Sequence, residues 1–209
     1  MRIPAAHHNA FLLHFQHKLC SAAGTVPKSC KRAMQRPSSD YSLGMQADRL
    51  INWPPTPREV EVVIEVPRGS FLKRGSTGHI DFVSPLPCPF NYGAVPTHLG
   101  MEGDLLDALV LGPRLALGTR RCINAWGAVT LTDRGMSDEK LVCSDHAPSL
   151  DEIRGVLRFF RFYARCKWLL NLYRRRPGRN GCDGWCTVGE AFARARPLPR
   201  TWTGPGVPF

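Results

Sequence analysis

Apolar and polar residues alternate in short runs through the middle of the chain, a pattern typical of β-strands that bury one face. Between Val60 and Val66 every second residue is apolar, with Glu61 and Glu65 among the residues between them, and Pro67 ends the run. Further β-type runs follow at 80–83, 108–111, 122–131 and 141–143. Turns rich in glycine and proline separate these runs at short intervals, so the pattern predicts a small barrel or sandwich.

The spacing of apolar residues changes to that of a helix after residue 149. Ser149 and Glu152 have the spacing of a capping box, and apolar residues then recur three or four positions apart over 153–164. Pro177 marks the end of this segment, and a shorter second helix is predicted over 188–195. Strands followed by helices indicate an α+β, mainly β, fold.

Charge is distributed unevenly along the chain. The 209 residues carry a net charge of +11, which taken alone favours a binder of nucleic acid or anionic membranes. Residues 1–58 carry +6 and residues 154–209 carry +10, whereas residues 59–153 carry −5. An acidic middle favours cations over a phosphate backbone, and no run of about 18 apolar residues exists that could span a membrane. We therefore expect neither nucleic acid nor membrane as a partner.

The first 57 residues differ in composition from the rest, with four histidines and no acidic residue before Asp40. Two interpretations are open: a transit peptide within residues 1–40 that would direct the protein to an organelle, or a disordered or linker extension of a cytoplasmic protein. We expect an N-terminal extension over 1–57, one domain over 58–198 and a tail over 199–209. The eight cysteines form no CxxC pair and complete no zinc site, which favours reduced thiols and a cytoplasmic location.

Three carboxylates fall within six residues, directly before a predicted strand. These are Glu102, Asp104 and Asp107, and Gly103 between them permits a tight turn. Hard divalent cations such as Mg²⁺ prefer oxygen ligands of this kind. The group could hold a metal ion, or it could be a solvated acidic turn.

A second acidic group follows at the end of another β run. Asp133, Asp138 and Glu139 belong to it, and Lys140 comes directly after. Two carboxylate clusters with a lysine beside them suit a site for metal ions and phosphate.

Four segments in one order carry a resemblance to a known family: IEVPRGS at 64–70, FNYG at 90–93, EGDLLD at 102–107 and LTD at 131–133 followed by Lys140. Their order and spacing resemble those of the soluble family I inorganic pyrophosphatases, over roughly residues 60–185. The resemblance implies a closed five-stranded barrel of the OB type with flanking C-terminal helices. It also implies Mg²⁺-dependent hydrolysis of pyrophosphate to two phosphates, in a homo-oligomer.

The resemblance implies a role for each matching residue. Asp104 would bridge metal ions and activate the attacking water. The other metal ligands would be Glu102, Asp107, Asp133 and Asp138. Phosphate oxygens would be held by Lys73, Tyr92, Lys140 and Tyr163, and Glu65 would be a further acidic residue of the site.

The sequence departs from the family pattern at several of these positions. Glu102 stands in place of an aspartate, and a family glutamate, tyrosine and lysine are replaced by Gly75, Cys88 and Ala164. Contacts to phosphate are therefore depleted, which would reduce activity unless Arg74, Arg161 or Arg165 substitute for them. Two alternatives stay open: a non-catalytic domain of this type that binds phosphate or a polyanion, and a hydrolase of another phosphoanhydride.

Overall fold

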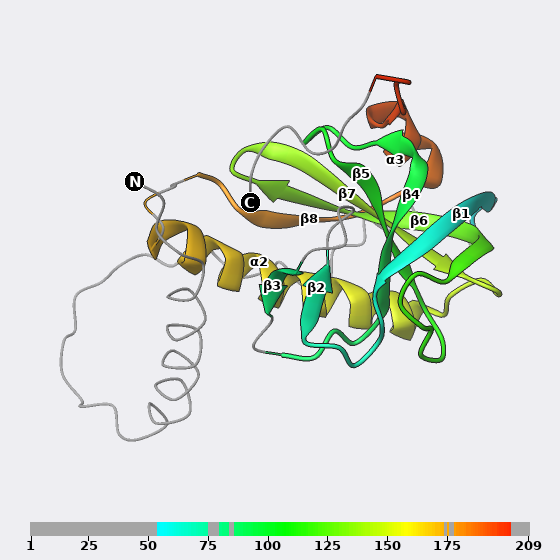
Figure 1. Cartoon of the computed structure of the whole chain (residues 1–209), viewed down its shortest axis with the longest axis horizontal. Helices are drawn as coiled ribbons and strands as arrows, with labels where there is room; N and C mark the ends of the chain where they lie inside the picture. Colours follow the sequence, from blue (N-terminus) through cyan, green and yellow to red (C-terminus); the bar gives the residue numbers. More distant parts are fainter. Residues whose placement is uncertain (1–53, 75–79, 84–85, 174, 176–177, 202–209) are drawn as a thin grey trace.

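Five strands form a closed barrel in the computed structural model, which describes residues 54–74, 80–83, 86–173, 175 and 178–201. In order around the barrel these are β1 (Arg58–Val66), β4 (Asn91–Leu99), β5 (Leu105–Val110), β7 (Met136–Ser144) and β6 (Arg120–Asp133). β6 pairs back with β1 and so closes the ring (Figure 1). Neighbouring strands are antiparallel except β5 and β7, which run parallel.

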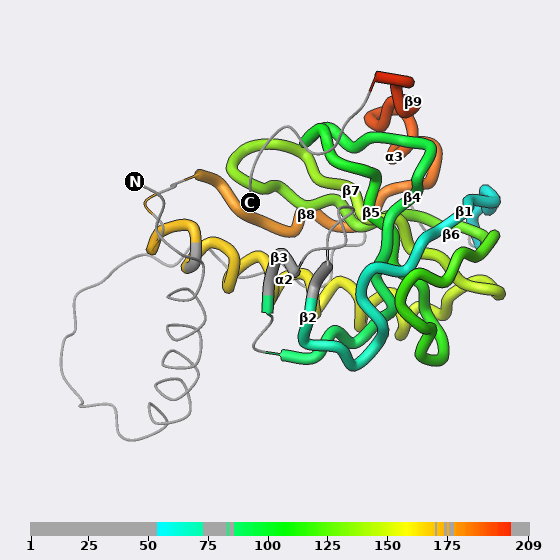
Figure 2. Tube along the Cα trace, in the orientation of Figure 1, coloured from blue at the N-terminus to red at the C-terminus, as the bar shows by residue number. Residues whose placement is uncertain are grey.

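The remaining elements surround the barrel. β8 (Gly181–Cys186) extends the sheet beside β6, β9 (Arg196–Pro197) pairs with β4, and β2 (Leu72–Arg74) pairs with β3 (Ile80–Val83). Two helices follow the barrel strands, α2 (Leu150–Tyr173) and α3 (Val188–Arg194). Figure 2 shows α2 running along the barrel with β8 returning beside it.

The alternation of side chains divides the apolar residues between the two faces of the barrel wall. Ala108, Val110, Leu141 and Cys143 belong to one cluster, which also includes Val188 and Ala191 of α3. Their neighbours along the same strands, Leu109 and Val142, belong to the other cluster, which contains Ile153, Val156, Leu157 and Phe160 of α2. The first cluster fills the barrel interior, and α2 covers the outer face of β5, β6 and β7.

The predicted capping box begins α2. The backbone N–H of Glu152 donates to the Ser149 hydroxyl at 3.2 Å, and the Ser149 N–H donates to the Glu152 carboxylate at 2.8 Å. These bonds satisfy amide groups that a helix start leaves without partners.

The predicted fold class is confirmed: the chain is mainly β, with a closed five-stranded barrel and C-terminal helices. Four strands were not predicted: the short β2 and β9, and the longer β4 and β8. β4 contains Gly93 and Pro96, and β8 contains Gly181 and Gly184, residues that usually weaken a strand. Gly93 is required because a Cβ there would lie 2.1 Å from the carbonyl oxygen of Val63 on β1.

Residues 1–53 and 202–209, on which most of the predicted extension and tail fall, lie outside the described residues. Within the described part, no helix is both long enough and apolar enough to cross a membrane.

Candidate active site

The outer face of the barrel changes from apolar to polar along its length. Because side chains alternate on a strand, Asp107 lies on the same face as Leu109, and Lys140 on the same face as Val142. The register places Asp107 directly beside Lys140 and places Asp138 beside Leu131. The apolar part of this face carries α2, and the polar part brings Asp107, Asp138 and Lys140 together.

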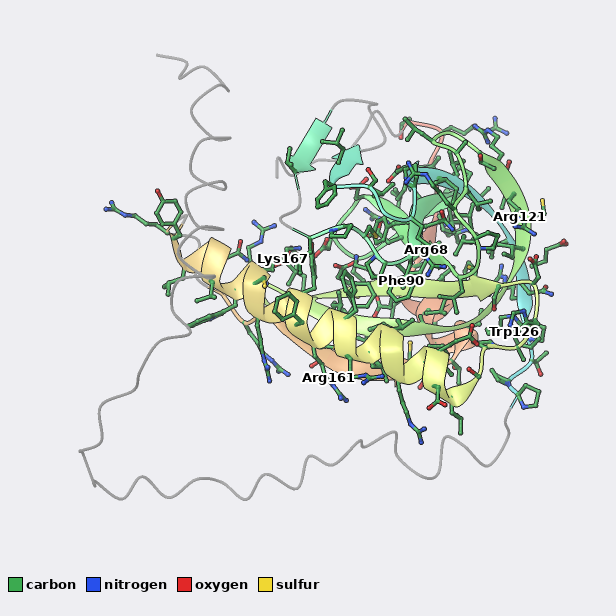
Figure 3. The ribbon with its side chains drawn as sticks, turned by 90° about the horizontal axis from the view of Figure 1, so that it is seen from below. Arg68, Phe90, Arg121, Trp126, Arg161 and Lys167 are labelled. Carbon is green, nitrogen blue, oxygen red and sulfur yellow. The ribbon has the colours of Figure 1, made fainter. Side chains whose placement is uncertain are left out.

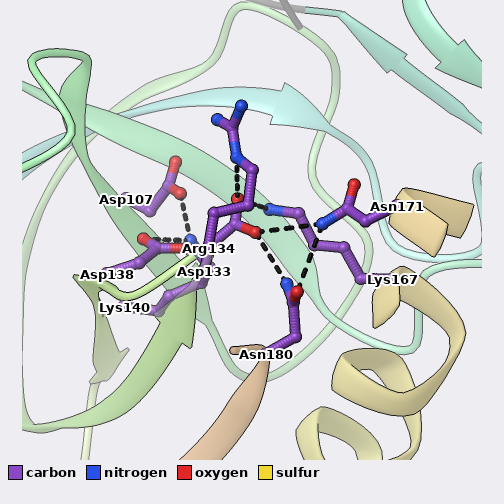
Figure 4. Close-up of polar contacts among 8 residues, drawn as sticks. All are labelled: Asp107, Asp133, Arg134, Asp138, Lys140, Lys167, Asn171 and Asn180. Atoms are coloured by element: carbon purple, nitrogen blue, oxygen red, sulfur yellow. Dashed lines mark hydrogen bonds and ion pairs between the residues drawn. The ribbon is translucent and has the colours of Figure 1, made fainter. Parts of the chain in front are cut away.

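Lys140 lies between two carboxylates at the centre of this polar area. Its ammonium group donates to Asp107 Oδ2 and, at 2.7 Å, to Asp138 Oδ1 (Figure 4). The lysine is 5% exposed. Although burial lowers the pKa of Lys140, the charges of Asp107 and Asp138 outweigh that effect and raise it well above the ordinary value. Lys140 therefore stays charged and neutralises part of the cluster.

Tyr92 of β4 lies beside this pair. The Lys140 nitrogen is 5.7 Å from the centroid of the Tyr92 ring. Burial, and next the charge of Asp107, raise the pKa of Tyr92 well above its usual value. The phenol therefore stays protonated at neutral pH and can donate a hydrogen bond.

Asp133, at the end of β6, is held by a second set of donors. Lys167 donates to its Oδ2 at 2.6 Å, while Asn180 and Asn171 donate to its Oδ1 at 2.7 and 3.4 Å (Figure 4). Arg134 lies 3.9 Å from Oδ2. Burial alone would raise the pKa of Asp133, but the bond and charge of Lys167, with Asn180 and Arg134, lower it. The carboxylate is thus ionised and has polar neighbours on both oxygens.

Glu102 lies in the turn between β4 and β5, and it is the least satisfied member of the group. Among the described residues, its Oε1 is the one buried side-chain nitrogen or oxygen without a hydrogen-bond partner. Burial, followed by the negative charge of Asp138, raises the pKa of Glu102 to about 7. A buried carboxylate oxygen in this position is a ready acceptor for a cation.

The other predicted site residues lie on neighbouring elements. Asp104 precedes β5, and its Oδ1 accepts the backbone N–H of Leu105 at 2.8 Å. Glu65 lies at an irregularity of β1, where Val66 pairs with Tyr92. Tyr163 is half-buried on α2, next to the apolar cluster under that helix. Lys73 and Arg74 belong to β2, and their side chains are outside the described part of the structure.

Four residues around Asp133 were missed by the sequence prediction: Lys167, Asn171, Asn180 and Arg134. The signal that could have found the first two is their spacing, because Lys167 follows Tyr163 by four positions and Asn171 follows Lys167 by four. Residues four apart share one face of a helix.

Two of the three arginines proposed as substitutes, Arg161 and Arg165, have side chains that the structure describes. Arg161 acts electrostatically on Cys182 of β8, and Figure 3 shows its side chain and that of Lys167 leaving α2 on different sides. Arg165 is exposed.

Magnesium fits the donors of this site by their chemistry, since they are carboxylates and one buried oxygen among them has no partner. The described residues include no group of three His, Cys, Asp or Glu already placed to hold an ion. Lys140 and Lys167 instead engage oxygens of Asp107, Asp138 and Asp133. Metal binding here would therefore compete with the two ammonium groups.

The chain is similar to known proteins. The sequence model of a family described as inorganic pyrophosphatase matches residues 62–166, half of the chain. The chain is 34% identical over 98 residues to the inorganic pyrophosphatase of Gluconobacter oxydans, in an alignment that spans 43% of this chain and 57% of that protein. It is 32% identical over 157 residues to the soluble inorganic pyrophosphatase of Oryza sativa subsp. indica, spanning 66% of this chain and 69% of that protein.

A solved structure is similar as well. The crystal structure of the inorganic pyrophosphatase from Thermus thermophilus superposes with a TM-score of 0.56 at 26% identity, covering 66% of this chain and 88% of that one. The family match, the similar proteins and the fold all indicate the same family. The chain belongs to the inorganic pyrophosphatase family.

Proposed function

We propose that this protein hydrolyses inorganic pyrophosphate to two phosphates with Mg²⁺ as its metal. The observation that carries the proposal is the polar area on the outer face of the barrel, which falls within the segment that matches the family. It gathers Asp107, Asp133 and Asp138 with Lys140, beside the partnerless oxygen of Glu102. Carboxylates and lysine together are the groups that metal ions and phosphate require.

The carboxylates that would hold metal ions are those of Glu102, Asp104, Asp107, Asp133 and Asp138. Bound Mg²⁺ would neutralise charge on pyrophosphate and make a water molecule more acidic. Glu102 is one methylene longer than aspartate, and its raised pKa means that a cation would displace a proton from it near neutral pH.

The protein's own side chains would act on the substrate as acids, bases and anchors. Asp104 would accept a proton from the attacking water, whose oxygen forms a new bond to one phosphorus while the bridging P–O bond breaks. Lys140 and Lys73 would hold phosphoryl oxygens by charge, and the protonated phenol of Tyr92 would donate a hydrogen bond. Tyr163 would contribute another hydroxyl from α2, and Glu65 a further carboxylate beside Tyr92.

The decisive test measures phosphate release from pyrophosphate with Mg²⁺ and with EDTA, for the wild type and Asp104→Asn. The asparagine keeps an oxygen for the Leu105 N–H but loses the base, so we expect kcat to fall by about 10²–10⁴-fold. Asp145→Asn is the matched control, because Asp145 is exposed and pairs with Arg121 away from the site. Retention of full activity by Asp104→Asn, with an unchanged far-UV spectrum, would overturn the assignment.

A second candidate function is favoured by one observation. Lys140 and Lys167 pair with three of the predicted metal ligands, as they would in a domain that binds phosphate or a polyanion without hydrolysing it. Calorimetric binding of pyrophosphate with no phosphate release in Mg²⁺ would support this alternative. Release from tripolyphosphate or nucleoside triphosphates, but not from pyrophosphate, would indicate a hydrolase of another phosphoanhydride.

The domain limits 58–198, the homo-oligomeric state and the cytoplasmic location also stay proposals. Light scattering after gel filtration tests the oligomer, and imaging of the full chain beside a variant lacking residues 1–40 tests the location.

A further inference from the structure

Lys167 is a positively charged side chain at the site that no part of the proposed mechanism uses. It is the one lysine of α2, and it extends from the helix one turn after Tyr163 to reach Asp133 at 2.6 Å. Its side chain is 23% exposed, so it is largely enclosed but still in contact with solvent. Electrostatic interactions link it to Tyr163, Lys140 and Asp138 as well. Lys167 therefore lies within the group of residues proposed to bind metal and phosphate.

Asp133 does not depend on Lys167 alone for its partners. Its Oδ1 accepts hydrogen bonds from Asn180 and Asn171, and Arg134 lies near its Oδ2. A cation that takes Oδ2 would replace the ammonium group, and it would leave the amide contacts on Oδ1 in place. The freed ammonium group then needs another anion nearby, because an unpaired charge in a largely enclosed position is costly.

Pyrophosphate supplies that anion if the proposed function holds. Of the other positions on α2, Arg161 leaves the helix on a different side from Lys167 and acts electrostatically on Cys182. Arg165 is exposed, and Ala164 has no polar group. We propose that Lys167 is a substrate-binding residue: Asp133 holds it in the metal-free protein, and it donates to a phosphoryl oxygen once a metal ion occupies Asp133. This inference rests on the proposed function, and it adds to that function a phosphate contact from Lys167, a residue that the sequence prediction did not include.

Steady-state kinetics with Mg-pyrophosphate give the first test, on Lys167→Gln and Lys167→Arg. Loss of one charge-assisted hydrogen bond should raise KM about tenfold for Lys167→Gln. The arginine variant keeps the charge and should recover most of the affinity. Arg158→Gln is the matched control, since it removes one charge from an exposed position of the same helix. An unchanged KM for Lys167→Gln, even with a lowered melting temperature, would show a merely structural role and overturn the proposal.

Metal binding without substrate gives the second test. Titration of the metal-free protein with Mn²⁺, followed by electron paramagnetic resonance, measures affinity at the carboxylates directly. Because Lys167→Gln removes the competing ammonium group, it should bind Mn²⁺ several-fold more tightly than the wild type or Arg158→Gln. Equal or weaker binding would contradict the exchange of partners at Asp133.

The two tests also separate this inference from the proposed function. If the wild type releases no phosphate from pyrophosphate, the proposed function fails, and calorimetric binding of pyrophosphate with Mn²⁺ then replaces KM as the measure. Weaker pyrophosphate binding by Lys167→Gln would still support the assignment of Lys167, and unchanged binding would overturn it.

Discussion

Replacing Lys140 with methionine should destabilise the metal-free protein strongly. The lysine side chain is 6% exposed and lies between the carboxylates of Asp107 and Asp138, which are 21% and 10% exposed. Methionine fills a similar volume but leaves two neighbouring negative charges without their counter-ion. Breaking a buried ion pair by removing one partner costs about 3–5 kcal/mol, and the partial exposure of Asp107 favours the lower end, about 3 kcal/mol.

Urea unfolding in EDTA, followed by circular dichroism, measures this loss. Because Asp107 and Asp138 raise the pKa of Lys140 well above its ordinary value, the lysine is charged at pH 8 in the wild type. The full deficit of about 3 kcal/mol should therefore appear in Lys140→Met at this pH, corresponding to a melting temperature lower by roughly 10 °C.

The double variant Lys140→Met with Asp138→Asn is the control for the mechanism. It removes one of the two negative charges, so it should recover part of the stability lost in Lys140→Met. If Lys140→Met is as stable as the wild type at pH 8, the ion pairs do not stabilise this area and the reasoning is refuted.

Two further substitutions test other parts of the structure. Burial and the charge of Asp138 raise the pKa of Glu102 to about 7, so the ionised carboxylate destabilises the folded state increasingly as pH rises from about 4.5 through 7. Glu102→Gln should therefore be more stable than the wild type by about 2 kcal/mol at pH 8 in EDTA. At pH 5 the two proteins should differ little. Parallel pH profiles of unfolding free energy for the two proteins would contradict this. Gly93→Ala should lower the free energy of unfolding by at least about 3 kcal/mol, because the new Cβ would collide with the Val63 carbonyl. The control Gly155→Ala places its Cβ in open space and should stabilise α2 by up to about 1 kcal/mol. Equal unfolding free energies for the two alanine variants would show that the close approach of β1 and β4 imposes no constraint.

Local patterns in the sequence account for much of the barrel and for the central carboxylates. β1 was predicted from its alternation, and α2 from its capping box and apolar spacing. Asp107 and Lys140 were predicted as site residues, and the parallel pairing of β5 with β7 places them side by side. The sequence did not reveal β4 and β8, because their glycines and proline are tolerated through tertiary contacts that no local pattern shows.

The donors that hold Asp133 could not be derived from the sequence for a similar reason. Asn180 reaches Asp133 across 47 positions in sequence, and only the return of the chain as β8 beside β6 brings the two together. Lys167 and Asn171 had a visible helical spacing from Tyr163, but nothing in the sequence fixes which face of α2 meets the sheet beyond its apolar residues.

The site takes residues from the barrel strands and from α2, and these two kinds of element differ in how freely a site residue can change its position in the sequence. Asp107 and Lys140 lie on paired strands, where a shift of one position would turn each side chain to the other face of the barrel. A residue on α2 can move by four positions and stay on the same face, about one turn further along the barrel. On α2 of this chain, Ala164 follows Tyr163, and Lys167 is presented one turn later. Divergence of the proposed phosphate contacts is therefore expected on the helix, while Phe160 keeps α2 packed in the apolar cluster against the sheet.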